Sequence, residues 1–340
     1  MTLRALAFPV AVVATLTPAA AFCQPVDPME ASYERSAWMR EARWGAMVHY
    51  LYDWLSRDHG IPMDTGRWNE LVDAFDVTGL AEQLRSVGAG YLVFTIGQNS
   101  GYYVSPNPTY DRLVGTRPSR LARRDLVSDL SAALRERGLR LIVYLPSGAP
   151  NRDEAARAAL EWQNGPHANL AFRRRWEAVV RDWSLRWGDA IDGWWFDGCY
   201  WPNTMYRSPE PPNFRSLAAA ARAGNPRSVV AFNPGVVPRL LSVTPWEDYI
   251  AGEISDPAVL SIRRSVDGRI DGKQIHVLSY LGRTWGAGKP RFAAEQAVSW
   301  SADVRAEGGV ITWDVPVTPA GLLGEPFLAQ LRAIGVGLRR

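Results

Sequence analysis

One carboxylate stands directly after three aromatic residues in the segment Trp194-Trp195-Phe196-Asp197-Gly198. Burying a carboxylate among aromatic rings is costly unless polar partners surround it. A nucleophile or general base in a carbohydrate site would have such partners, whereas an aspartate that only caps the next turn would need few of them. Asp197 is therefore the leading candidate for chemistry, and the turn-capping role is its alternative.

Glycoside hydrolysis ordinarily needs a second carboxyl group. Glu253, which ends the segment Asp248-Tyr249-Ile250-Ala251-Gly252-Glu253, is the best candidate for it. The alternative for Glu253 is a strand-end residue paired with a nearby arginine. Asp314 is a further candidate, although an aspartate before Val315-Pro316 could simply fix a turn. A carboxyl separation of roughly 5–5.5 Å between Asp197 and Glu253 would indicate retention, and roughly 6.5–9.5 Å inversion.

Further polar and aromatic residues are predicted near the ends of other strands. The apolar faces of sugar rings stack on aromatic planes, and this chain has 15 Trp and 12 Tyr, although most of these must belong to the core. The candidates for holding a substrate are His49, Gln98, Asn99, Tyr144, Trp195, Asn233, His276, Trp285 and Trp313. For each histidine the alternative is a hydrogen-bonded core residue. No metal-ligand spacing and no G-x-S-x-G segment is present, so we expect no metal, no cofactor and no serine nucleophile.

The elements that must position these residues alternate between short apolar segments and amphipathic ones. Eight segments are typical of strands buried on both faces: Trp44–Tyr50, Tyr91–Gly97, Leu139–Leu145, Gly193–Cys199, Ser228–Asn233, Asp248–Ile254, Ile275–Tyr280 and Gly309–Val315. Helical patterns separate most of them, at Val77–Val87, Asp125–Arg137, Leu170–Trp187, Phe214–Ala223, Phe292–Ala306 and Glu325–Leu338. This alternation predicts a single (β/α)8 barrel, in which the candidate residues converge at the carboxyl ends of the strands. An open doubly wound sheet is the alternative, but no Gly-rich phosphate loop follows the first strand.

The bulk properties favour one large exported domain. The chain has 340 residues and a formal net charge of +3, which does not favour a nucleic-acid partner. Arg4, the apolar run from Ala5 to Leu16 and the small residues at 19–21 predict a signal peptide over residues 1–21. Phe22 before Cys23 does not favour a lipid anchor. We expect residues 22–340 to form the barrel, in the periplasm or secreted, with no membrane association after cleavage.

Several segments resemble glycoside hydrolase family 29, the α-L-fucosidases. The stretch from Trp38 to His49 is similar to the family's first-strand motif, in which a histidine contacts the sugar, and residues 89–95 are similar to its second strand. Trp195-Phe196-Asp197-Gly198 resembles the segment that holds the nucleophilic aspartate. The residues from Gly308 to Gly321 resemble the ending of the family's barrel.

The resemblance implies an exo-acting, retaining glycosidase with Asp197 as nucleophile and Glu253 as candidate acid/base. As a departure from the family, we expect a barrel without the C-terminal β-sandwich that is common there. Gln98 and Asn99 stand where the family has a His-His pair that grips the sugar, and this departure favours a bound sugar that differs from fucose. Two alternatives stay open: a carbohydrate-binding barrel that has lost catalysis, and a barrel enzyme of another reaction type, such as a polysaccharide lyase.

Overall fold

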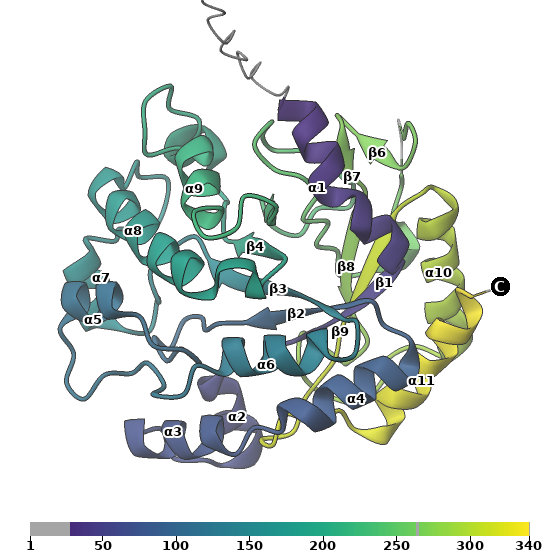
Figure 1. Ribbon diagram of the computed structural model, residues 1–340, viewed down its shortest axis with the longest axis horizontal. Coiled ribbons are helices and arrows are strands. Elements are labelled where there is room, and N and C mark those ends of the chain that lie inside the picture. Colours follow the sequence, from purple (N-terminus) through teal and green to yellow (C-terminus); the bar gives the residue numbers. More distant parts are fainter. Residues whose placement is uncertain (1–27, 263–264, 340) are drawn as a thin grey trace, which may run out of the picture.

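A parallel sheet of seven strands forms the centre of the protein in a computed structural model, which describes residues 28–262 and 265–339 (Figure 1). The predicted signal peptide and Cys23 lie outside the described residues. The strand order is β5-β4-β3-β2-β1-β9-β8. The strands are β1 (Trp44–Val48), β2 (Tyr91–Thr95), β3 (Arg140–Pro146), β4 (Gly193–Asp197), β5 (Val229–Phe232), β8 (His276–Tyr280) and β9 (Val310–Asp314). The sheet is curled in the manner of a TIM-type α/β fold.

Each strand buries side chains on both faces. The inner face carries a compact cluster that includes Met47, Val93, Ile142, Trp195 and Leu278. The alternate residues of the same strands point outward and pack against helices in a much larger cluster. Strands buried on both faces need near-continuous apolar runs, and this requirement explains why their positions were visible in the sequence.

Helices cover the outer face of the sheet. The α-helices are α1 (Pro28–Ala42), α2 (Tyr52–His59), α3 (Thr65–Asp73), α4 (Val77–Val87), α5 (Pro108–Val114), α6 (Leu126–Arg135), α7 (Glu154–Leu160), α8 (Leu170–Trp187), α9 (Phe214–Ala221), α10 (Ala294–Ala306) and α11 (Glu325–Gly337). Several start at a capping aspartate: Asp76 accepts from the Gly79 amide and Asp125 from the Ser128 amide. Shorter turns occupy Gly188–Ala190, Pro202–Tyr206 and Pro257–Val259, and a small hairpin joins β6 (Arg269–Ile270) to β7 (Lys273–Gln274).

The predicted sixth strand, Asp248–Ile254, is not a regular strand. It lies between β5 and β8, where the Asp248 amide donates to the Val230 carbonyl and the Leu278 amide donates to the Gly252 carbonyl. Only isolated bridges form, one of them between Glu253 and Leu278. Gly252 has a φ of +65°, and a Cβ atom there would lie 1.9 Å from the His276 carbonyl oxygen. The backbone therefore leaves strand geometry at Gly252, and the prediction of eight regular strands is wrong at this position.

Helix α1 lies across the amino ends of the strands. Arg35 forms an ion pair of 2.9 Å with the buried Asp248, and the Trp38 ring packs edge-on against Tyr91 at 5.7 Å. Met39 is fully buried in the inner cluster. Because α1 closes this end, a ligand reaches the interior of the sheet from the carboxyl ends of the strands.

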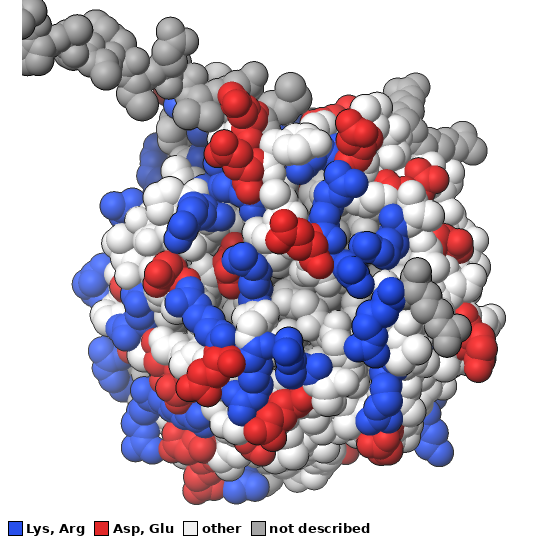
Figure 2. Space-filling view, turned by 45° about the vertical axis from the view of Figure 1, so that its right-hand side comes forward, with Lys and Arg blue, Asp and Glu red and all other residues white. Residues whose placement is uncertain are grey.

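The described surface carries charges of both signs. On the face in Figure 2, Lys and Arg side chains lie between Asp and Glu side chains, so the many arginines of the sequence are mixed with acids there. Many of these arginines are in ion pairs, for example Arg67 with Glu70 and Arg124 with Asp129. No helix in the described part of the chain is long and apolar enough to cross a membrane.

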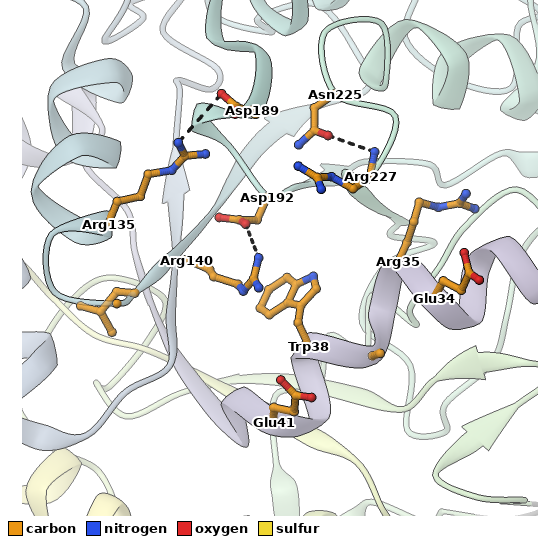
Figure 3. A pocket seen from close by; sticks show the side chains of 13 residues that line it. Glu34, Arg35, Trp38, Glu41, Arg135, Arg140, Asp189, Asp192, Asn225 and Arg227 are labelled. Atoms are coloured by element: carbon orange, nitrogen blue, oxygen red, sulfur yellow. Dashed lines mark hydrogen bonds and ion pairs between the residues drawn. The ribbon is translucent and has the colours of Figure 1, made fainter.

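A hollow of about 720 Å³ opens beside α1, near the amino ends of β3 to β5 (Figure 3). Trp38 projects toward its centre and lies under the Arg140 guanidinium at 4.9 Å. Arg140 is paired with Asp192 at 2.6 Å and Arg135 with Asp189 at 3.9 Å. The charges of this hollow largely neutralise one another, and it lies far from the candidate carboxylates described next.

Candidate active site

Polar side chains from several strands converge at the carboxyl end of the sheet. Asp197 ends β4, Asn233 follows β5, Tyr144 lies near the end of β3, and His49 follows β1. Parallel pairing in register brings these ends to one edge, since Pro146 of β3 lies opposite Asp197 of β4. The site is thus positioned by rigid strands.

Asp197 accepts hydrogen bonds from three directions. Its Oδ1 accepts from the Gly198 amide at 2.8 Å and from Asn233 Nδ2 at 2.8 Å, and its Oδ2 accepts from the Tyr144 hydroxyl at 2.6 Å. Burial and the Asp197 charge raise the pKa of Tyr144 well above its usual value, so this phenol stays protonated and donates. Donors from β3 and from the segment after β5 are more than a turn-capping aspartate requires.

Glu253 lies beside Asp197 and accepts a short hydrogen bond from Asn233 Nδ2. Burial, followed by the negative charge of Asp197, raises the pKa of Glu253 to about 7, while the Asn233 hydrogen bond and His49 act in the opposite direction. The Asn233 Oδ1 accepts from the Gly235 amide at 3.1 Å, which turns the amide nitrogen toward the carboxylates. The irregular backbone at Gly252 thus delivers a partly neutral carboxyl group to the site.

His49 and Asp314 form a second buried pair. His49 Nδ1 donates to Asp314 Oδ1 at 2.7 Å, and the Gly286 amide donates to Asp314 Oδ2 at 2.5 Å. Both carboxylate oxygens of Asp314 are therefore engaged, and this residue orients the histidine. The His49 ring stacks on Trp54 of α2 with centroids 4.8 Å apart. Its Nε2 has no hydrogen-bond partner among the described residues.

Gln98 and Asn99 extend the hydrogen-bond chain that ends at Asp197. Gln98 Nε2 donates to the Tyr144 hydroxyl oxygen at 2.5 Å, and Asn99 Nδ2 donates to Gln98 Oε1 at 3.4 Å. Both side chains are half-buried. They are therefore linked through Tyr144 to the Asp197 carboxylate.

Two of the predicted tryptophans lie beside these groups. Trp195 is buried below Asp197, where its ring stacks on Tyr144 at 5.3 Å and its indole donates to the Ala251 carbonyl at 3.1 Å. Trp285 is half-buried, 4.6 Å from the Tyr280 ring and 6.2 Å from the His49 ring. The first forms part of the floor of the site and the second part of its wall.

Two predicted site residues lie elsewhere. His276 is fully buried deeper in the sheet, with Nδ1 at the carbonyls of Ile250 and Ala251 and Nε2 at Thr312 Oγ1, and burial lowers its pKa to about 4. Trp313 points outward, where its indole donates to Ser301 of α10 at 2.9 Å. The prediction that these two side chains face the site is wrong, because strand alternation puts Trp313 on the outer face and His276 in an inner layer below the site.

Two aromatic residues of the site were not predicted. Trp54 lies in α2, and its spacing from His49 gave no signal because α2 itself was not predicted. Tyr200 follows Asp197 by three residues and is 52% exposed; the Asp197 charge, then burial and the Glu253 charge, raise its pKa. Its position just past the strand end is the signal that could have identified it.

Within the described ranges, no group of three or more His, Cys, Asp or Glu side chains converges as it would around a metal ion.

Comparisons with known proteins give the fold. No family model matches the chain, and no curated protein sequence does. An endo-fucoidan hydrolase of glycoside hydrolase family 107 superposes with a TM-score of 0.71 at 22% identity, over 92% of this chain. This chain spans only 54% of that structure. At this identity the likeness is one of fold.

Two shorter relatives support the same assignment of the fold. A second family 107 endo-fucoidan hydrolase superposes with a TM-score of 0.65 at 15% identity, over 89% of this chain and 92% of the other. An α-L-fucosidase from Lactobacillus casei, solved with α-L-fucose, gives a TM-score of 0.60 at 15% identity, over 89% and 98%. The predicted resemblance to the fold of the fucosidases is confirmed, and the chain shares that fold with these enzymes at low sequence identity.

Proposed function

We propose that the protein is a retaining glycoside hydrolase of the fucosidase type, with Asp197 as nucleophile and Glu253 as acid/base. The observation that carries this proposal is the single Asn233 nitrogen that donates to both carboxylates. Two oxygens that share one donor can be no farther apart than twice a hydrogen-bond length, or about 6 Å. This limit favours the short separation of retaining enzymes over the roughly 6.5–9.5 Å of inverting ones.

The unequal environments of the two carboxyls support unequal roles. Glu253, with a pKa of about 7, is largely protonated in mildly acidic solution and can give its proton to the glycosidic oxygen as that bond breaks. Asp197 then forms a bond to the anomeric carbon through one carboxylate oxygen. In the second step, ionised Glu253 takes a proton from water, whose oxygen attacks the anomeric carbon and releases Asp197.

The neighbouring side chains would hold the sugar over the carboxylates. Trp195 and Tyr144 provide an aromatic floor, and His49 offers Nε2 to a hydroxyl group. Trp54 and Trp285 flank the His49 ring. Gln98 and Asn99 add neutral donors and acceptors in place of a pair of imidazoles. This difference would make the protein select a different sugar from the one that other fucosidases bind.

The structural neighbours support an α-L-fucoside or a related sugar as substrate. They include both endo-fucoidan hydrolases and α-L-fucosidases, and we propose the exo-acting mode for this chain. Export to the periplasm or the medium, following cleavage of residues 1–21, belongs to the same proposal, since polymeric glycans are met outside the cytoplasm.

The decisive experiment traps the covalent intermediate. Residues 22–340 are incubated with a 2-deoxy-2-fluoro-α-L-fucosyl fluoride, digested and examined by mass spectrometry. We expect one sugar on the peptide that contains Asp197, and none on the Asp197→Asn variant. A label on another carboxylate, or turnover by folded Asp197→Asn, would refute the assignment.

Product masses separate the other two functions. Hydrolysis of a natural fucosylated glycan adds one water, whereas a lyase gives an unsaturated product without it. A folded protein that binds the glycan but neither releases sugar nor accepts the label would instead be a carbohydrate-binding barrel.

A further inference from the structure

We propose that Tyr200 forms the subsite for the first sugar on the leaving-group side of the scissile bond, so that the enzyme prefers an oligosaccharide leaving group. This inference rests on the proposed function and adds a specificity-determining residue to it. Tyr200 lies in the loop after β4, three residues beyond Asp197, and no hydrogen bond to its hydroxyl is found among residues 28–262 and 265–339.

The Tyr200 ring is held in place on one side and open on the other. Gly235, with a φ of +107°, comes so close that a Cβ atom there would lie 3.3 Å from Tyr200 Cε1. Trp201 meets the ring edge-on, with centroids 6.0 Å apart. More than half of the Tyr200 side chain nevertheless stays exposed, at 52%. A supported ring with an exposed surface is a suitable stacking platform for a sugar.

The loop that carries Tyr200 is hydrogen-bonded to the segment after β5, whose Asn233 donates to both carboxylates. The Cys199 amide donates to the Asn233 carbonyl at 2.9 Å, and the Gly235 amide donates to Asn233 Oδ1. The ring is therefore fixed relative to the amide that bridges Asp197 and Glu253. Its raised pKa, caused first by the Asp197 charge, then by burial and third by the Glu253 charge, is consistent with this proximity.

The remaining aromatic residues define the opposite side of the site. His49, Tyr144 and Trp195 are 7%, 2% and 2% exposed, and come from the end of β1, from β3 and from β4. A sugar among them is enclosed, so they suit the terminal unit that reacts. The rest of the glycan must pass toward solvent beside the proton donor. Tyr200 is exposed and packs against Gly235, two residues after the Asn233 that donates to Glu253, and we assign the departing unit to this side.

This arrangement predicts selective loss of activity. Contacts to the leaving group can be used to lower the barrier of the chemical step, so removing them reduces kcat/KM only for substrates that reach the subsite. We expect Tyr200→Ala to lower kcat/KM about tenfold or more for a trisaccharide with a terminal α-L-fucose, compatible with the loss of one aromatic contact. With α-L-fucosyl fluoride, whose leaving group is one atom, the change should stay below about threefold.

Two further variants sharpen the test. Tyr200→Phe keeps the ring and should retain most of the trisaccharide activity. Tyr33→Ala removes a tyrosine of similar exposure, 44%, from α1 at the other end of the protein, and should leave the ratio of the two activities unchanged. Equal losses on both substrates in Tyr200→Ala, or no loss on either, would overturn the subsite.

The subsite and the proposed function fail in different ways. If the wild-type protein turns over neither substrate, hydrolysis of α-L-fucosides is refuted and calorimetry tests Tyr200 directly. Tyr200→Ala should then lose affinity for the trisaccharide and keep its affinity for free fucose. Equal affinity of wild-type and Tyr200→Ala protein for the trisaccharide would refute the subsite as well.

Discussion

Asp197 and Glu253 accept hydrogen bonds from the same nitrogen, Nδ2 of Asn233. The shared donor is neutral, so it satisfies an oxygen on each carboxyl without cancelling the charge of either, as a lysine or arginine would. Two carboxylates this close resist double ionisation, and burial together with the Asp197 charge raises the pKa of Glu253 to about 7, which favours the proton on Glu253. Under the proposed function, this difference would let two carboxyl groups of the same chemistry serve as proton donor and nucleophile.

The pH dependence of activity should follow Glu253. Because its pKa is raised to about 7, the proton needed for leaving-group departure is present below that pH and lost above it. We expect kcat/KM on a natural glycan to fall as the pH rises through about 7, and Glu253→Gln to abolish most of this activity. The same variant should keep its kcat/KM on α-L-fucosyl fluoride, whose departure needs no acid, while its kcat falls because the attack of water in the second step loses its base. Steady-state pH profiles with both substrates measure this.

Glu247→Gln is the matched control for that measurement. Glu247 is also buried, and burial raises its pKa to about 8, but its Oε1 accepts from the Val243 amide outside the site. Its substitution should leave the alkaline limb of the profile near pH 7 in place. If the fall in activity near pH 7 persisted in Glu253→Gln and disappeared in Glu247→Gln, the proton donor would be Glu247 and not Glu253.

Removing the shared donor Asn233 should move the alkaline limb of the pH profile, that is, the fall of kcat/KM as the pH rises through about 7. The Asn233 hydrogen bond lowers the pKa of Glu253, so Asn233→Ala should shift the alkaline limb to higher pH. The maximal rate should fall by about tenfold or more, since Asp197 also loses a positioned donor. Asn225→Ala, which removes a buried amide donating to Ile191 at the other end of the sheet, controls for stability alone. An unshifted limb in Asn233→Ala would contradict the bridging role.

Most of the sheet could be predicted because its strands are buried on both faces. Seven of the eight predicted segments contain strands, and their apolar runs are required by helices on one side and an inner cluster on the other. The prediction of the sixth strand, Asp248–Ile254, was wrong because this segment has the apolar pattern of a strand. Gly252 takes a left-handed conformation within it, beside His276, and the sequence pattern does not show this. Short helices such as α2 and α7 lie in loops that carry no long periodic pattern.

The site was predictable where a residue type and a strand end coincided. Asn233 was expected to bind substrate, but its contact with both carboxyls depends on the loop at Gly235 and has no sequence signal. Trp313 and His276 failed for one physical reason. Register and depth along the strand decide which side chains reach the site at the carboxyl end of the sheet. A shift of one residue moves a side chain from the inner face of the sheet to the outer one.

The His49–Asp314 pair should control substrate binding. Asp314→Asn keeps the shape of the side chain, but an amide cannot accept from both His49 Nδ1 and the Gly286 amide. We expect KM to rise about tenfold with a smaller change in kcat, because the ring loses its fixed orientation. His49→Ala should show at least the same loss, and the double variant should add little to it. His59→Ala, an exposed histidine in α2, should have no effect.

The backbone at Gly252 should be essential to the fold and not only to the position of Glu253. A methyl group at Gly252 meets the His276 carbonyl at 1.9 Å, so Gly252→Ala must displace the segment from β8 as well as strain a φ of +65°. Gly60 has a similar φ of +64° with no atom within 4 Å of the added Cβ, so Gly60→Ala measures the conformational cost alone. We expect about 1 kcal/mol of destabilisation for Gly60→Ala and about 3 kcal/mol or more for Gly252→Ala, measured by denaturant unfolding. Equal losses in the two variants would mean that the close approach to His276 does not constrain this segment.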